Sequence, residues 1–226
     1  MSITGGQSPI ISRKNVVNML VKQSRTDFSY YFLLALATFI TTFGLTLNSE
    51  AIVVGGMLMA PLLKPVLALG LAIVTLSPKS LSRSLFGIIN SIAVVLALSF
   101  IASLVVHDGN YLTTQILARG EYSHLFFIIA ILSGVGAAYS LLNPNIKTAL
   151  PGVAVSVSLL PPLCVSGIAL AQENYLLLTN SQRIFWANFI GIIIAASVVF
   201  IIFRFAHLRR HEESVITKQE ANESTL

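Results

Sequence analysis

Six long apolar runs divide the chain, and helices that cross a membrane are the structure this pattern favours. Only 10% of the 226 residues are charged and 55% are hydrophobic, whereas about 25% charged residues is usual for a soluble domain. A helix needs about 20 apolar residues to cross a bilayer. The predicted spans cover residues 29–47, 51–76, 83–106, 124–142, 148–171 and 184–206. The sequence therefore predicts an all-α integral membrane protein with six transmembrane helices.

Most positively charged residues fall on one side of these spans. With six spans the two termini share a side, and 11 of the 14 Lys and Arg residues lie there. The opposite side carries Arg119 and Arg183, and Lys64 lies within a span. Because Lys and Arg are enriched on the cytoplasmic side, we expect a multi-pass inner-membrane protein with both termini in the cytoplasm. The basic residues flank apolar spans, so nucleic acid is not an expected partner.

The expected division of the chain follows from the spans. It comprises a basic cytoplasmic tail (1–28), a first three-span unit (29–106), an extracytoplasmic loop (107–123), a second three-span unit (124–206) and a polar cytoplasmic tail (207–226). In the first tail, the side chains of Val16, Val17, Leu20 and Val21 would share one side of a short helix. Such a helix would rest on the membrane surface. A disordered basic tail is the alternative.

The two three-span units carry a sequence repeat. At an offset of 97 residues, the recurring pairs are Asn48 and Asn145, Gly55 and Gly152, Pro65 and Pro162, and Gly70 and Gly167. A unit with three spans that is duplicated in tandem inserts its second copy upside down. Inverted repeats of this kind underlie many secondary transporters, whose site lies near the bilayer midplane between the copies.

The second and fifth spans contain prolines within their apolar length, namely Pro61 and Pro65 in one and Pro161 and Pro162 in the other. Each proline lacks an N–H and leaves a carbonyl four residues earlier without its helical partner. Such carbonyls are tolerated only where protein or water satisfies them. We therefore predict two broken helices that face each other, with Pro65 and Pro162 each beginning a half-helix whose N-terminus favours an anion. Simple kinks are the alternative.

Lys64 lies near the middle of the second span, and no acidic residue lies inside any span to pair with it. A charge at that depth should face a cavity or a partner. It would bind a mobile anion, substitute for a coupling cation, or lose its proton on burial. The other interpretation is that Lys64 snorkels to the cytoplasmic surface and anchors the helix.

Three further polar residues complete the predicted site: Ser158, Asn90 and Asn188. The two asparagines occupy the third and sixth spans and could instead serve only as hydrogen-bonding partners between helices. Small residues spaced four apart, which include Gly56 and Ala60 and also Thr148, Gly152 and Ser156, would pack helices or assemble an oligomer.

Enzymatic motifs are absent from the sequence, which has no paired carboxylates, no Ser-His-Asp arrangement and no phosphate-binding loop. Cys164 is the single cysteine, and the histidines lack the spacing of metal ligands. We therefore expect no enzyme activity, no cofactor and no metal.

Two motifs resemble a known family. The segments "GGMLMAPLLKPVLALGLA" (55–72) and "ALPGVAVSVSLLPPLCVSGIALA" (149–171) are similar to the GAMLxAPLxxP and GVAxAxxLxPPLxxxG patterns of domain of unknown function 389, a family of bacterial and archaeal membrane proteins. The resemblance covers about residues 30 to 205 and implies location and fold without an established activity. The family's pattern has a small residue where Lys64 stands, so Lys64 departs from it.

These observations favour a secondary transporter of a small, anionic solute, bound at mid-depth between the broken helices. Two other functions fit the same sequence. The first is a module that assembles into oligomers without transporting anything, and the second is a channel. The lipid bilayer is an expected partner in each case, and a homo-oligomer is compatible with all three.

Overall fold

The computed structural model describes residues 13–23, 26–106, 112–120, 124–143 and 149–223, and within these ranges the regular structure is helical, with no strand. Three helices are long and apolar enough to cross a membrane: α2 (Phe28–Thr46), α5 (Pro78–Val105) and α9 (Tyr175–Ile202). A fourth span results if the bent pair α3 (Glu50–Met59) and α4 (Leu63–Thr75) is taken as one. Helix α7 (His124–Ser140) and the Ser158–Ala171 part of α8 (Ala149–Ala171) are apolar but shorter. The protein is therefore an all-helical membrane protein.

Helices α5 and α9 begin earlier than the predicted starts at residues 83 and 184, because each has an N-terminal cap in the polar segment that precedes the apolar run. The Ser77 side chain accepts a hydrogen bond from the Ser80 N–H, and Pro78 occupies the first turn of α5. The Asn174 side chain accepts a hydrogen bond from the Leu177 N–H at the start of α9. Capping of this kind satisfies N–H groups that have no partner in the first helical turn.

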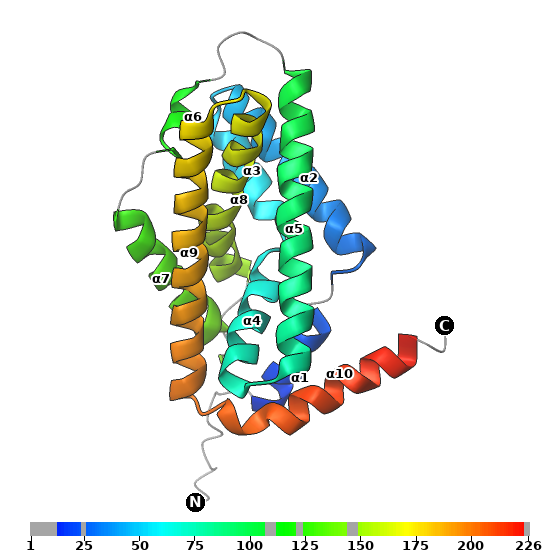
Figure 1. Cartoon of the computed structure of the whole chain (residues 1–226). Helices are drawn as coiled ribbons and strands as arrows, with labels where there is room; N and C mark the ends of the chain where they lie inside the picture. The colour runs from blue at the N-terminus through cyan, green and yellow to red at the C-terminus, as the bar shows by residue number, and fades with distance from the viewer. Residues whose placement is uncertain (1–12, 24–25, 107–111, 121–123, 144–148, 224–226) are drawn as a thin grey trace, which may run out of the picture.

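Two central elements, α4 and α8, each contact both α5 and α9 (Figure 1). In the same view α5 runs upward and α9 runs downward, and the half-helix α4 lies below α3. On the outside of this group, α2 packs against α3 and α5, while α7 packs against α9 and α8. The core is formed where these helices meet and includes the fully buried side chains of Leu67, Leu71, Leu159, Phe185 and Phe200.

Two glycines at equivalent repeat positions lie where the two halves of the chain pack together. A Cβ atom added at Gly70 of α4 would lie 3.4 Å from the Ala196 side chain of α9, and the Ser197 hydroxyl donates a hydrogen bond of 3.2 Å to the Gly70 carbonyl. A Cβ atom at Gly167 of α8 would clash with the Ser99 hydroxyl of α5. Each central helix therefore uses its glycine to approach the long helix of the other half. Asn145, which belongs to the same repeat, lies outside the described residues.

The prolines have different consequences in the two spans. Between α3 and α4 the chain bends by 54°, and Ala60, which precedes Pro61, has extended backbone angles (φ −70°, ψ 121°). A proline disfavours helical angles in the residue before it, so this break was predictable. Pro65 lies in the first turn of α4, as predicted.

The predicted break in the fifth span is wrong, because α8 continues from Ala149 to Ala171 with Pro161 and Pro162 inside it. Adjacent prolines remove two neighbouring hydrogen bonds within one turn, whereas Pro61 and Pro65 interrupt the bonding pattern over two successive turns. Pro162 therefore does not begin a half-helix, and only α4 presents a helix N-terminus at a break.

The terminal segments form helices that pack together. Helix α1 (Arg13–Gln23) contacts α10 (Arg209–Glu223) and α4 at the same end of the molecule (Figure 1). The apolar residues Val16, Val17, Leu20 and Val21 are buried in these contacts. The predicted short helix is therefore present, but its apolar side packs against the protein and is not available to a membrane surface.

Part of the predicted loop 107–123 is helical as well. Helix α6 (Thr114–Leu117) is attached to the turn between α2 and α3. The Thr113 hydroxyl donates to the Leu45 carbonyl at 2.7 Å, and the Asn48 side-chain oxygen accepts from the Thr114 hydroxyl at 2.7 Å. These contacts place the residues after α6 beside the central helices.

The small residue Gly56 is buried within the chain and is not part of an assembly surface. A Cβ atom there would lie 2.8 Å from the Thr41 backbone nitrogen of α2. Gly56 therefore allows α2 and α3 to pack closely. Thr148 of the other small-residue series lies outside the described residues, and the side-chain surroundings of the helical residue Gly152 are not described.

Candidate functional site

The break between α3 and α4 lies against α8. The Ser156 hydroxyl of α8 donates a hydrogen bond of 3.0 Å to the carbonyl oxygen of Ala60, which is the C-cap residue of α3. That carbonyl has lost its place in a regular helix, and a side chain from the other half of the chain satisfies it. Next to this contact, Pro65 shares a small apolar cavity of about 20 Å³ with Leu159 and Leu163 of α8. The proline-containing segments of the two halves therefore meet.

A second hydrogen bond satisfies a carbonyl that the prolines of α8 leave free. Pro162 has no N–H to offer to the carbonyl of Ser158, four residues earlier. The Asn188 side-chain nitrogen of α9 donates to this carbonyl oxygen at 2.9 Å. Both residues are buried, and this hydrogen bond satisfies the carbonyl at the point where the prolines interrupt the bonding of α8.

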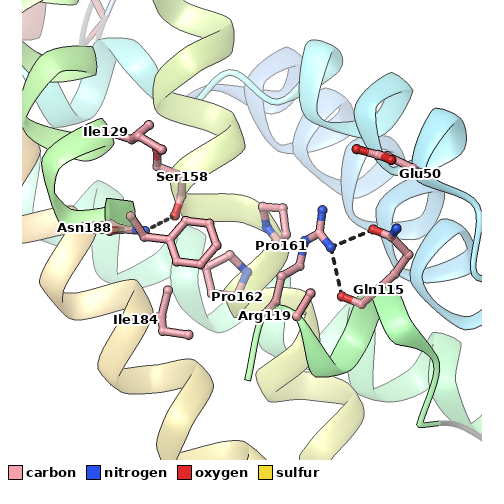
Figure 2. Close-up of a pocket in the computed structure, with 11 residues that line it drawn as sticks. Glu50, Gln115, Arg119, Ile129, Ser158, Pro161, Pro162, Ile184 and Asn188 are labelled. Atoms are coloured by element: carbon pink, nitrogen blue, oxygen red, sulfur yellow. Dashed lines mark hydrogen bonds between the residues drawn. The ribbon is translucent and has the colours of Figure 1, made fainter. Parts of the chain in front are cut away.

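A cavity of about 330 Å³ opens beside the same prolines (Figure 2). It brings together four of the residues that the sequence predicted, namely Ser158, Pro161, Pro162 and Asn188. The other lining residues are Glu50, Gln115, Ala118, Arg119, Phe126, Ile129 and Ile184. The volume equals that of about ten water molecules at ~30 Å³ each, which is enough for a small organic molecule.

The remaining predicted residues do not line this cavity. Pro65 lines the small apolar cavity described above, and Pro61 and Asn90 are half-buried elsewhere, in the linker between α3 and α4 and on α5. Lys64 lies in the first turn of α4, and its side chain is exposed on the surface of the molecule. The lysine that drew attention in the sequence is therefore not part of the cavity.

Arg119 is a lining residue that the sequence did not single out. It follows α6, and its Nη1 donates to the Gln115 carbonyl at 2.8 Å and to the Gln115 side-chain oxygen at 2.7 Å. Burial lowers the pKa of Arg119, and the nearby negative charge of Glu50 partly opposes this effect. An arginine remains protonated under such conditions because its ordinary pKa is far above neutral. Arg119 therefore supplies a positive charge to the cavity.

The signal that could have identified Arg119 was its isolation, since Arg119 and Arg183 are the only basic residues that the charge count placed on the less basic side. Which of the two would reach a cavity depends on the attachment of α6 to the turn between α2 and α3. Figure 2 shows the Arg119 guanidinium next to Pro161 and Gln115, with the Asn188–Ser158 pair on the other side of the two prolines.

Asn188 also presents an unsatisfied atom. Its side chain is 3% exposed, its nitrogen is engaged by the Ser158 carbonyl, and its oxygen has no hydrogen-bond partner. The side-chain nitrogen and oxygen of Asn188 cannot be interchanged, because the Asn188 oxygen would then face the Ser158 carbonyl oxygen. A buried acceptor without a partner is unfavourable, so this oxygen is suited to a ligand or a water that donates a hydrogen bond.

Metal ligation finds no support in the described ranges, where His, Cys, Asp and Glu side chains nowhere gather in a group of three that could hold an ion.

The family described as domain of unknown function (DUF389) matches residues 57–194, which include α8 and most of the residues around the cavity. The chain belongs to this family. An uncharacterized protein from Methanocaldococcus jannaschii is 29% identical over 199 residues. That match covers 86% of this chain and 58% of the relative, so this DUF389 chain spans a little over half of the relative's length. No solved structure matches the chain.

Proposed function

We propose that this DUF389 protein is a secondary transporter of a small anionic solute, which binds in the cavity between α6 and the prolines Pro161 and Pro162 of α8. The observation that carries the proposal is the cavity itself, because it combines the charge of Arg119 with the unsatisfied oxygen of Asn188 at a proline-containing helix. Polar groups gathered around carbonyls that prolines deprive of helical partners are compatible with a transporter binding site.

The proposed architecture is six spans arranged as two inverted units, α2 to α5 and α7 to α9. The opposite directions of α5 and α9 in Figure 1 support this arrangement. The glycine contacts support it as well, since Gly70 packs against α9 and Gly167 packs against α5. A pseudo-twofold axis between the units would exchange these two contacts.

The proposed location is the inner membrane, with both termini in the cytoplasm. The contact between the terminal helices α1 and α10 supports a common side for the two ends. The excess of Lys and Arg on that side supports the cytoplasm. Cysteines introduced singly at Asn15 and Ser214, both exposed, should react with a membrane-impermeant maleimide only after the membrane is permeabilised. The native Cys164 is buried and provides a low background.

Flux through the purified protein tests the proposal. Uptake and counterflow in proteoliposomes should reveal saturable transport of at least one anion from a panel of carboxylates, phosphate and sulfate. The variant Ile129→Trp fills the cavity and should reduce that flux, whereas Ile128→Trp, at a neighbouring position that is equally exposed but does not line the cavity, should not. Absence of flux for every solute, with correct insertion demonstrated, would contradict the proposal, and flux that never saturates would favour a channel.

An assembly module that does not transport is the second candidate. The observation that favours it is open space beside Gly55 and Gly136, where an added Cβ atom would meet nothing within 4 Å. Small residues on an open helix face allow another helix to approach closely. Under this alternative, Gly136→Leu should abolish oligomers detected by crosslinking in membranes, and no solute should show flux.

A further inference from the structure

The chemistry of the cavity also indicates which anions it selects. Resting on the transport function proposed above, we infer that the ligand is a small hydroxylated monocarboxylate, with its carboxylate on Arg119 and its hydroxyl on Asn188.

The carboxylate position follows from the donors that Arg119 has left. The two hydrogen bonds that its guanidinium donates to Gln115 both use Nη1. Within the described part of the chain, Nε and Nη2 make no hydrogen bond. These two groups form the planar edge of the guanidinium that binds the two oxygens of a carboxylate side by side. Gln115 therefore orients Arg119 and leaves this edge free.

Glu50 adds a negative charge near Arg119. It begins α3, lines the same cavity and is exposed. Its negative charge favours the protonated guanidinium against the effect of burial. A ligand with a single negative charge suits this setting better than one with two, because Glu50 would repel the second charge.

The hydroxyl position follows from Asn188. Its side-chain oxygen is buried, unpartnered and fixed in orientation by the bond from the amide nitrogen to the Ser158 carbonyl. A ligand hydroxyl would supply the missing donor. An otherwise identical ligand without the hydroxyl would leave the oxygen unpaired, which should weaken binding about 10- to 100-fold.

The middle of the cavity suits a short hydrocarbon chain. The apolar part of the lining includes Phe126 and Ile184, and Figure 2 shows Pro161 and Pro162 between Arg119 and Asn188. A volume of about 330 Å³ accommodates a ligand with roughly ten or fewer non-hydrogen atoms, by comparison with the ~30 Å³ that a water molecule occupies. The four features together describe a short hydroxy acid.

Equilibrium binding to the full-length chain in detergent tests the inference. Labelled 3-hydroxybutyrate is displaced by unlabelled 3-hydroxybutyrate, butyrate, inorganic phosphate or 1,3-butanediol, which differ in the hydroxyl, the carboxylate or both. We expect 3-hydroxybutyrate to bind at least about 10-fold more tightly than butyrate, and the diol and phosphate to compete poorly. Equal affinities of 3-hydroxybutyrate and butyrate, or no binding of either, would overturn the inference.

Variants separate the two ends of the site. Arg119→Gln should abolish binding of both acids. Arg183→Gln makes the same charge change at an exposed position outside the cavity and should leave the binding of both acids unchanged. Asn188→Ala should weaken the binding of 3-hydroxybutyrate and leave the binding of butyrate unchanged. The preference for the hydroxylated acid should therefore disappear. Retained binding in a monodisperse Arg119→Gln protein would contradict the assignment. If Asn188→Ala does not fold, the comparison of butyrate and 3-hydroxybutyrate affinities in the unmodified protein still tests the inference.

The outcome for this ligand class is distinct from the outcome for transport. Saturable flux of phosphate or sulfate without discrimination between the two acids would remove the inference and leave the transport function standing. Preferential binding of 3-hydroxybutyrate without flux of any anion in proteoliposomes would support the inferred ligand class and contradict the transport function. The two results are separable because the binding assay does not depend on transport.

Discussion

The side-chain nitrogen of Asn188 lies 2.9 Å from the carbonyl oxygen of Ser158, the oxygen that Pro162 leaves without a helical partner. This contact joins α9 to α8 at the edge of the cavity. It both maintains the helix across the two prolines and fixes the direction of the Asn188 oxygen. The stability of the fold and the composition of the site therefore depend on the same side chain.

Removal of the Asn188 amide should destabilise the protein. Asn188→Ala removes the hydrogen bond that its amide nitrogen donates to the buried Ser158 carbonyl, which should lower the free energy of unfolding by about 1–3 kcal/mol. Asn90→Ala is the matched control, because Asn90 is half-buried on α5 and does not line the cavity. Thermal unfolding in detergent, followed by size-exclusion chromatography, measures the difference. Similar melting temperatures for the two variants would contradict the role assigned to Asn188.

Close packing at Gly167 should make even a methyl group harmful. An alanine Cβ there would meet the Ser99 hydroxyl and lie 2.9 Å from the Leu96 carbonyl oxygen. Gly167→Ala should therefore lower the free energy of unfolding by about 1–3 kcal/mol. Gly136→Ala, in open space, should instead be neutral or stabilise by up to about 1 kcal/mol, because alanine favours helix. Thermal unfolding of both variants distinguishes the sites. Partial recovery in Gly167→Ala combined with Ser99→Gly would identify the clash as the cause.

Lys64 should not contribute to solute affinity. Its side chain is exposed in the first turn of α4 and does not line the cavity, so Lys64→Ala should change the affinity of the transported anion by less than about twofold, well below the factor of ten that 1.4 kcal/mol represents. Saturation kinetics in proteoliposomes provide the measurement. A large loss of affinity in a correctly folded Lys64→Ala protein would place the lysine in the site after all.

Docking of the C-terminal helix should depend on pH through Glu212. This residue of α10 is fully buried and accepts a hydrogen bond from the Thr75 hydroxyl at the end of α4. Burial raises the pKa of its carboxyl, with opposing contributions from Ser80 and Thr75. Because the docked state favours the protonated form, docking should be strongest below the ordinary pKa of about 4.3. It should weaken as the pH rises through the raised pKa of the docked carboxyl.

Spin labels at Ser82 of α5 and Ser214 of α10, both exposed, report this docking as a distance between the two helices. The distance distribution should broaden as the pH rises in the unmodified protein. In Glu212→Gln it should stay narrow over the same range, because glutamine has no proton to lose. A pH response that is the same in both proteins would contradict the role of Glu212.

Local sequence predicted the break between α3 and α4 but left open which way the Lys64 side chain points. The break follows from Pro61 and Pro65 themselves, which act on the residues next to them. The same argument failed for α8, because the partner of the freed Ser158 carbonyl is Asn188, 30 positions further along the chain. Lys64 was conspicuous as a charge in an apolar run, yet which way its side chain points depends on helix packing that no local pattern contains.

The amino-acid sequence by itself determined that this is an all-helical membrane protein of its family, since apolar length, charge content and the two proline motifs are properties of contiguous residues. It also indicated four of the residues that line the cavity. Only the tertiary structure decided that Arg119 joins them, because a short helix in a polar segment is attached to the turn between α2 and α3 through Thr113 and Asn48. Contacts between distant segments set the position of such a charge, and these form only when the helices pack together.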